Sequence, residues 1–218
     1  MLLVLKFFAL AYSALFPVIN PLGSALMFLT VVGSVPTEQF RYLVRKVSVS
    51  MVLFLLVFEL GGAALLNFFG ISLPVVQLAG GLVLAAMGWR MLDQSENADG
   101  QGTSSVCDVG TLERKIFFPL TFPISAGPAC IVVTLTLSAH ASRHELLNNV
   151  LAHLGMALAI VALGATIWLC YAYASRITQK IAPETIQGVL RVVAFVLLCI
   201  GVQIASNGWQ AIVKAAPK

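Results

Sequence analysis

Six long apolar runs dominate this chain of 218 residues. Each run is near or above the roughly 20 apolar residues that an α-helix needs to cross a bilayer. The runs are continuously apolar, whereas the strands of an outer-membrane barrel would alternate in polarity over about 10 residues. The sequence therefore predicts an all-α, polytopic membrane protein with six transmembrane helices. In chain order, the runs cover residues 7–33, 47–69, 73–89, 116–139, 150–174 and 192–213.

The composition excludes a soluble globule. Hydrophobic residues make up 59% of the chain and charged residues 10%, whereas about 25% of the residues in an ordinary soluble domain are charged. Too few polar side chains are present to cover a water-facing surface. A cleaved signal peptide is the alternative for the first run, but this run continues to Gly33. It is therefore longer than the apolar region of such a peptide.

Lysines and arginines gather on one side of the six predicted spans. When they are assigned to alternating sides, nine fall on one side and four on the other. The richer side is expected to face the cytoplasm. Both termini then face the periplasm or exterior, and the polar stretch 93–115 is a cytoplasmic loop. The nine residues are Arg41, Arg45, Lys46, Arg90, Arg114, Lys115, Arg176, Lys180 and Arg191, and the four are Lys6, Arg143, Lys214 and Lys218.

A proline pattern recurs in the first run of each half. Residues 16–21 and 118–123 both read Phe-Pro, three further residues, and a second proline. The chain is therefore predicted to be a single transmembrane domain, residues 1–218, with a first repeat at about 1–92 and a second at about 116–218. Because each repeat has three helices, the two copies are expected to point in opposite directions across the membrane. Inverted repeats of this kind are typical of many secondary transporters.

Two prolines four residues apart are expected to break the first helix of each repeat, because each lacks a backbone N–H and clashes with the carbonyl one turn earlier. Such breaks persist in a bilayer only where protein or a water-filled cavity covers the freed backbone groups. Freed carbonyls can bind a cation or an ammonium group, and the N-terminus of a half-helix can receive a carboxylate. The alternative is that the prolines only kink two packed helices.

The two breaks are accordingly predicted to meet at mid-membrane and to bind a small solute there. The candidate substrate-binding residues are Asn20, Pro21, Gly23, Ser24, Pro123, Ser125, Gly127 and Pro128.

The same segments resemble the MarC family of bacterial inner-membrane proteins. Residues 16–23 and 28–30 are similar to its N-terminal signature, and residues 69–72 with 79–81 are similar to the start of its third helix. Residues 119–128 resemble its second signature, although Ala129 follows where the family usually has a glycine. The resemblance implies a six-helix membrane protein in a wider group that includes lysine exporters. Some relatives are described as transporters of small neutral amino acids.

Three polar side chains lie well inside the apolar runs. Glu59 is roughly 15 Å of helix from the end of its run, and an ionisable group at that depth usually marks an ion or substrate pathway. Glu59 is therefore a candidate for carrying a coupling proton, the alternative being a hydrated position near the interface. Gln77 and Gln203 are candidates for lining the cavity, although glutamines in membranes also bond one helix to the next.

No residue pattern supports an enzyme, a cofactor or a metal site. Metalloprotease, nucleophile-elbow and nucleotide-binding motifs are missing, and His140 and His144, four residues apart, lack a pattern that completes a metal site. The sequence is interpreted as that of a secondary transporter of small solutes, especially small neutral amino acids or related metabolites. Its expected partners are the lipid bilayer, the solute and a coupling H⁺ or Na⁺. A homo-oligomer is compatible with the sequence, and no nucleic-acid partner is expected. A non-transporting membrane subunit or scaffold, and a channel, are the alternatives.

Overall fold

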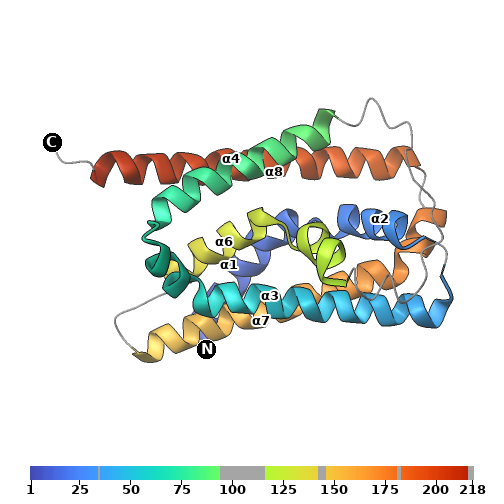
Figure 1. Cartoon of the computed structure of the whole chain (residues 1–218), viewed down its shortest axis with the longest axis horizontal. Coiled ribbons are helices and arrows are strands. Elements are labelled where there is room, and N and C mark those ends of the chain that lie inside the picture. Colours follow the sequence, from blue (N-terminus) through green and yellow to red (C-terminus); the bar gives the residue numbers. More distant parts are fainter. Residues whose placement is uncertain (34, 94–115, 142–145, 181–182, 216–218) are drawn as a thin grey trace.

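The computed structural model describes residues 1–33, 35–93, 116–141, 146–180 and 183–215, and these are almost entirely helical (Figure 1). This part of the chain contains no β-strand, which confirms the predicted all-α class. In chain order, the elements are α1 (Leu2–Ile19), α2 (Pro21–Val32), α3 (Thr37–Phe69), α4 (Leu73–Asp93), η2 (Ile116–Ser125), α6 (Pro128–Ala141), α7 (Leu146–Lys180) and α8 (Pro183–Ala215).

Five helices are long and apolar enough to cross a membrane, or six if the bent pair η2 and α6 counts as one span. The predicted set of about six membrane helices is therefore confirmed. The first of these spans, Leu2–Leu29, includes the break between α1 and α2. Several helices extend beyond their apolar runs, and α3 begins ten residues before its run, at Thr37. The predicted polar loop lies outside the described residues except for Asp93.

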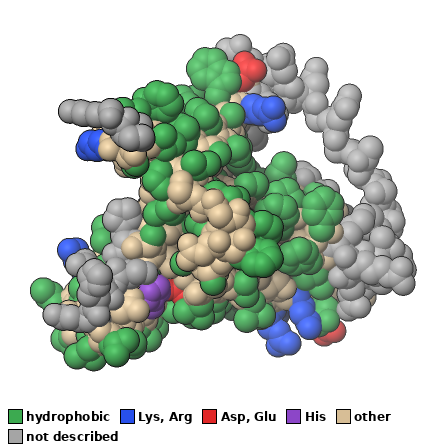
Figure 2. Space-filling model, turned by 60° about the vertical axis from the view of Figure 1, so that its left-hand side comes forward, with side chains coloured by type: hydrophobic (Ala, Val, Ile, Leu, Met, Phe, Trp, Pro, Cys, Tyr) green, Lys and Arg blue, Asp and Glu red, His purple; other side chains and the backbone are tan. Residues whose placement is uncertain are grey.

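The outer surface of the bundle is apolar. Figure 2 shows hydrophobic side chains over much of one face, with Lys and Arg toward its margins. Many of the exposed residues are large, among them Leu53 on α3, Trp89 on α4 and Phe195 on α8. Water would penalise such a surface, whereas lipid chains would not. The exposure pattern thus agrees with a protein whose helices are surrounded by the bilayer.

Both halves contain a broken first helix, but the two breaks differ in shape. In the first, the chain stays helical through Pro17, and only Asn20 interrupts it, with left-handed backbone at φ 48° and ψ 69°. In the second, Phe118 and Phe122 have extended backbone, each directly before a proline in a cis peptide bond. A proline disfavours helical backbone in the residue before it. The second break therefore bends the chain, with 67° between η2 and α6.

Helices from the two halves pack against each other rather than within each half. α7 contacts α1, α2 and α3, while η2 and α6 contact α3. α4 pairs with α8, and this pair lies beside the other helices as a second layer in Figure 1. The largest buried cluster combines side chains of α1, α2, α3, η2, α6 and α7. The inverted relation of the two halves and the orientation of the termini stay predictions.

Glycines allow α6 to pack closely against two neighbours. Gly62 on α3 leaves room for the side chain of Leu135, and Gly80 on α4 leaves room for that of Val132. A methyl group added at either glycine would overlap the facing side chain. Small residues are a common device for close helix contact in membranes. Through these contacts, α6 joins the α4–α8 layer to the rest of the bundle.

The backbones of α4 and α8 approach each other at further glycines. Gly81 and Gly88 lie seven residues apart on α4, and Gly201 and Gly208 lie seven apart on α8. A methyl group at Gly81 would overlap the backbone of Ala205 and lie 2.7 Å from the carbonyl oxygen of Gly201. Backbone cannot move aside as a side chain can. A larger residue at this contact would therefore push the two helices apart.

We expect Gly81→Ala to destabilise the protein by about 1 to 3 kcal/mol, because it overpacks a backbone contact. For a protein of this size, the apparent melting temperature in detergent should fall by about 3 to 10 °C. Gly61→Ala is the matched control, because nothing lies within 4 Å of a methyl group there. The close contact of α4 and α8 would be contradicted if the two variants melted at the same temperature.

Candidate functional site

The first break is built around Asn20. Asparagine adopts left-handed backbone more readily than most residues, and here its N–H donates to the carbonyl of Phe16 at 3.1 Å. Its side-chain oxygen accepts a hydrogen bond from the N–H of Gly23 at 3.2 Å. Asn20 thus ends α1 and caps the N-terminus of α2, which starts at Pro21. A methyl group at Gly23 would overlap the Asn20 side chain, so a glycine fits this cap.

Ser24 links the first break to the second. Its Oγ lies 2.7 Å from the carbonyl oxygen of Ile19 and 3.1 Å from that of Ile124. A hydroxyl has one hydrogen to donate, so the two carbonyls share it. Ile19 ends α1 and has lost its normal helical partner, because the N–H of Gly23 bonds to Asn20 instead. The serine therefore satisfies one freed carbonyl in each half of the chain.

Ser125 makes the matching contact within the second break. Its Oγ donates to the carbonyl of Leu120 at 2.7 Å, and Ser24 likewise reaches five residues back to Ile19. Ser125 also pairs with the hydroxyl of Tyr171 on α7 at 2.8 Å. Tyr171 interacts with the side chain of Ser24 as well. Ser24, Ser125 and Tyr171, here called the hydroxyl cluster, therefore join both breaks to α7.

The hydroxyl cluster is enclosed. Ser24 is 7% exposed, Ser125 is 1% exposed and Tyr171 is fully buried. On one side, the ring centroids of Phe28 and Tyr171 lie 4.6 Å apart, and those of Phe28 and Phe40 lie 5.6 Å apart. These polar groups thus face each other inside a largely apolar shell.

The remaining predicted break residues are placed unevenly. Pro21 and Gly127 are buried, whereas Pro123 and Pro128 are exposed. The backbone of Gly127 accepts a hydrogen bond from the N–H of Cys130 at 3.0 Å, which starts α6. The structure therefore brings Ser24 and Ser125 into one cluster, with Asn20 beside it as a cap. It does not bring Pro123 and Pro128 into the same interior.

Glu59 forms a buried pair with His153. The Oε1 atom of Glu59 lies 2.6 Å from Nδ1 of His153, between α3 and α7. The Glu59 side chain is fully buried, and the His153 side chain is 21% exposed. Ser138 on α6 donates to the backbone carbonyl of Glu59 at 2.7 Å. The other carboxyl oxygen, Oε2, is buried without a hydrogen-bond partner among the described residues.

The Glu59–His153 pair lies far from the hydroxyl cluster. Eighteen residues of α7, or roughly 27 Å of helix, separate His153 from Tyr171. Tyr171 stands only three residues before the end of the apolar run at Ala174. The hydroxyl cluster therefore contacts α7 near one end of its apolar run, and the meeting of the two breaks at mid-membrane stays a prediction. The two polar sites occupy different levels, and α7 connects them.

The two glutamines lie elsewhere. Gln77 is buried on α4, next to the close contact with Gly208 on α8. Gln203 is exposed on α8, where its amide donates to Asn207 one turn further on, at 2.9 Å. Neither residue contacts the hydroxyl cluster in the interactions described above. Their predicted role in lining a cavity stays a prediction.

Tyr171 and His153 are the residues that sequence reasoning did not place in a site. Each is a polar side chain inside the fifth apolar run, at 150–174. That position was a usable signal, because polar groups in a span need a partner. The partners themselves, Ser125 and Glu59, are 46 and 94 residues away in sequence. Within the described residues, no group of three or more His, Cys, Asp or Glu could hold a metal ion.

Comparison with known proteins gives one family and several relatives. The profile described as MarC family integral membrane protein matches residues 5–213. A membrane protein of Pyrococcus abyssi is 28% identical over 208 residues, which cover 95% of this chain and 96% of the relative. The inner membrane protein MarC of Salmonella typhimurium is 28% identical over 215 residues, which cover 96% of each chain. No solved structure matches the chain.

We expect Ser24→Ala to destabilise the protein by about 1 to 3 kcal/mol, because it leaves buried carbonyls without a donor. Its apparent melting temperature in detergent should fall by several degrees. Ser13→Ala is the matched control, since Ser13 is exposed and donates only to the carbonyl of Leu10, within α1. Equal melting temperatures for the two variants would show that the Ser24 contacts do not hold the breaks together.

We expect His153→Leu to destabilise the protein by about 3 to 5 kcal/mol, because it leaves the buried Glu59 carboxyl without its partner. Glu59→Gln should cost less, since an amide can still bond to the imidazole. Glu38→Gln is the matched control on α3, because Glu38 is an exposed acid in the first turn. Thermal unfolding of the three purified variants tests this order of stabilities. The Glu59–His153 pairing would be refuted if the His153→Leu and Glu38→Gln variants had the same melting temperature.

Proposed function

The chain belongs to the MarC family of integral membrane proteins, and we propose that it is a secondary transporter of small solutes. The proposed substrates are small neutral amino acids or related metabolites. The proposed location is a bacterial inner membrane, where the Salmonella relative is named as an inner membrane protein. In this proposal, the hydroxyl cluster and the two breaks around it form the solute site.

The observation that carries the proposal is the contact between the two breaks, made by Ser24 to the carbonyl of Ile124. Paired helix breaks in two halves of a transporter are typical of substrate sites. Here the groups at the contact are hydroxyls and freed carbonyls, without a formal charge. Such groups suit a small, neutral solute better than a strongly charged one, which would need a counter-charge in this buried place.

Both ends of a zwitterionic amino acid find partners in this proposal. If the breaks separate, Ser24 releases the carbonyl of Ile124, because this is the hydrogen bond that crosses from one break to the other. The carbonyl of Ile124 can then accept a hydrogen bond from an ammonium group. The N-terminus of α2 carries a partial positive charge, which favours a carboxylate. The solute would therefore replace a hydrogen bond that the protein makes with itself when empty, so that opening does not leave the carbonyl of Ile124 unsatisfied.

The described conformation corresponds, in this proposal, to an occluded state, because the hydroxyl cluster is enclosed. Alternating access requires the breaks to open toward each side in turn. The segments that must separate are the first break, α1–α2, and the second, η2–α6, since Ser24 bridges them. The predicted inverted repeats would supply this motion as a rocking of one half against the other.

The Glu59–His153 pair is the proposed proton site. A protonated Glu59 can donate to His153, and an ionised Glu59 can accept from it, so the 2.6 Å contact persists in either state. The partial exposure of His153 gives the buried carboxyl a route to water. α7 carries both His153 and Tyr171, so a movement of this helix would link proton uptake to the solute site. Na⁺ is the alternative coupling ion.

A structural role is the second candidate, and one observation favours it. The break carbonyls of Ile19, Ile124 and Leu120 already have serine partners, so the breaks need no ligand to be stable. A non-transporting subunit or scaffold would keep these contacts closed permanently. A channel, the third candidate, would carry a flux that does not saturate with solute concentration.

Purified protein in liposomes tests the proposal with labelled glycine, alanine and serine, under an imposed pH gradient. We expect saturable uptake by the wild-type protein, and a rate about tenfold lower for Ser125→Ala, which loses roughly one hydrogen bond to the solute path. Ser13→Ala should transport at the wild-type rate. Glu59→Gln should still exchange solute across the membrane while losing its response to the pH gradient.

Three outcomes would contradict the proposal. Folded wild-type protein that moves no member of the panel in either direction would favour the structural role. Non-saturating flux would favour a channel. Equal transport by Ser125→Ala and Ser13→Ala would remove the hydroxyl cluster from the solute path.

A further inference from the structure

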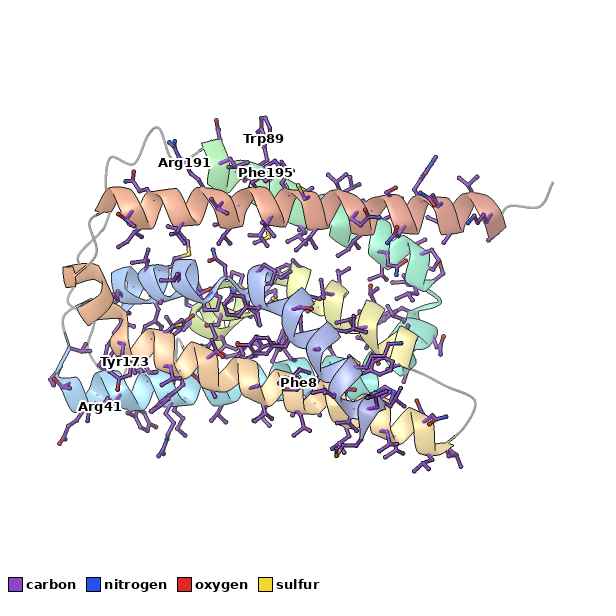
Figure 3. The ribbon with its side chains drawn as sticks, turned by 180° about the vertical axis from the view of Figure 1, so that it is seen from behind. Phe8, Arg41, Trp89, Tyr173, Arg191 and Phe195 are labelled. Carbon is purple, nitrogen blue, oxygen red and sulfur yellow. The ribbon has the colours of Figure 1, made fainter. Side chains whose placement is uncertain are left out.

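A cavity of about 920 Å³ lies between the α2–α3 connection, the first turns of α3 and residues 168–173 of α7. It is distinct from the hydroxyl cluster and from the Glu59–His153 pair. Two arginines line it, Arg41 and Arg45, one turn apart on α3. Aromatic rings also line it, those of Tyr42 on α3 and of Trp168 and Tyr173 on α7. Figure 3 shows Arg41 and Tyr173 at the same end of the molecule, on neighbouring helices.

No acid of the described residues neutralises the positive charge in this cavity. Arg41 and Arg45 are both exposed, and neither forms an ion pair with a carboxylate of the described residues. The nearest acid in sequence is Glu38, in the first turn of α3, and it is exposed. Two guanidinium groups one turn apart offer paired hydrogen-bond donors that fit phosphate oxygens. The cavity thus suits an anion with several oxygens.

The exposed surface of α3 changes from basic to apolar along the helix. Val49 and Leu53 follow the arginines, and both are exposed. Arg45 and Val49, four residues apart, share one face of the helix. A ligand that occupies the cavity and continues along this face would therefore have a charged head and an apolar tail.

α7 presents a matching apolar stripe. Trp168 lines the cavity, and Val161, Leu158 and Leu154 follow on the same face, all exposed. Tryptophan and tyrosine are enriched where a membrane protein meets the headgroup region. The ring of Trp168 and the three apolar side chains that follow it on α7 thus form a surface on which an acyl chain can pack. This arrangement distinguishes a lipid from a water-soluble anion.

A chain of aromatic rings lies between the cavity and the hydroxyl cluster. Phe40 lines the cavity and packs on Phe28, whose ring packs on Tyr171 of the hydroxyl cluster. Two aromatic rings therefore separate the arginines from the two breaks. The cavity is therefore a separate site from the proposed solute site.

We infer that this cavity is a binding site for an anionic phospholipid. Arg41 and Arg45 bind its phosphate, and the tyrosines and Trp168 pack against its glycerol region and first acyl carbons. Basic pockets between membrane helices bind anionic headgroups in this manner. The inference does not depend on transport, because it would hold equally for a structural member of the family.

Native mass spectrometry of the purified full-length protein tests the inference. The protein is titrated with phosphatidylglycerol and with phosphatidylcholine of the same acyl chains. We expect the wild-type protein to bind phosphatidylglycerol preferentially. The double variant Arg41→Gln with Arg45→Gln should bind phosphatidylglycerol about tenfold more weakly, since paired charge-assisted hydrogen bonds are removed. Arg41→Lys with Arg45→Lys should keep the preference for the anionic lipid and bind it more weakly than the wild-type protein.

Arg90→Gln with Arg191→Gln is the matched control. These arginines lie on α4 and α8, outside the cavity lining, and Figure 3 shows Arg191 on α8, in the other layer of the molecule. This control removes the same charge and should keep wild-type lipid binding. If both double variants lost binding equally, general surface charge would explain the preference, and the site would be refuted.

Two further arms separate a lipid from a soluble anion. Glycerol 3-phosphate and inorganic phosphate, added in large excess, should not displace phosphatidylglycerol, because they lack the acyl contacts. Trp168→Ala should weaken the binding of phosphatidylglycerol while both arginines remain. Displacement by the soluble anions, or an unaltered affinity in Trp168→Ala, would overturn the lipid assignment. Absence of any preference for phosphatidylglycerol in the wild-type protein would do the same.

Discussion

A helix can break inside a membrane only if the backbone groups that it frees find partners in the protein. In this chain, two serines supply those partners. Ser24 and Ser125 each reach a carbonyl five residues back, at 2.7 Å, and Ser24 also reaches across to Ile124 in the other half. The breaks are therefore held by each other and by Tyr171. The position of α7 against both halves follows from the same contacts.

The packing around this centre depends on small residues rather than on large apolar ones. Lipid chains are as apolar as leucine, so the hydrophobic effect gives little preference for one helix contact over another. Close contact then requires residues that let backbones approach, as Gly81 and Gly201 do between α4 and α8. Gly62 on α3 and Gly80 on α4 likewise leave room for side chains of α6. The two layers in Figure 1 are joined through these contacts.

Much of the candidate site could be predicted, though not its connections. The matched prolines located both breaks, and the depth of Glu59 in its run marked it as exceptional. The partner of Glu59 could not be predicted, because His153 is 94 residues away and looks like an ordinary polar residue in an apolar run. The form of the breaks was also beyond sequence reasoning. Pro17 remains inside a helix, while Phe118 and Phe122 become extended.

The sequence by itself determined that this protein is helical and lies in a membrane, because continuous apolar runs of this length leave backbone groups no solution but helices. It also located a break within a few residues of each proline pair, because proline cannot donate to the helix, although Pro17 itself stays helical. Only the tertiary structure decided what the breaks face, that Glu59 meets His153 far from them, and that Arg41 and Arg45 line a cavity with Trp168. Those contacts join residues that are distant in sequence, and their geometry depends on how α3 and α7 pack against each other.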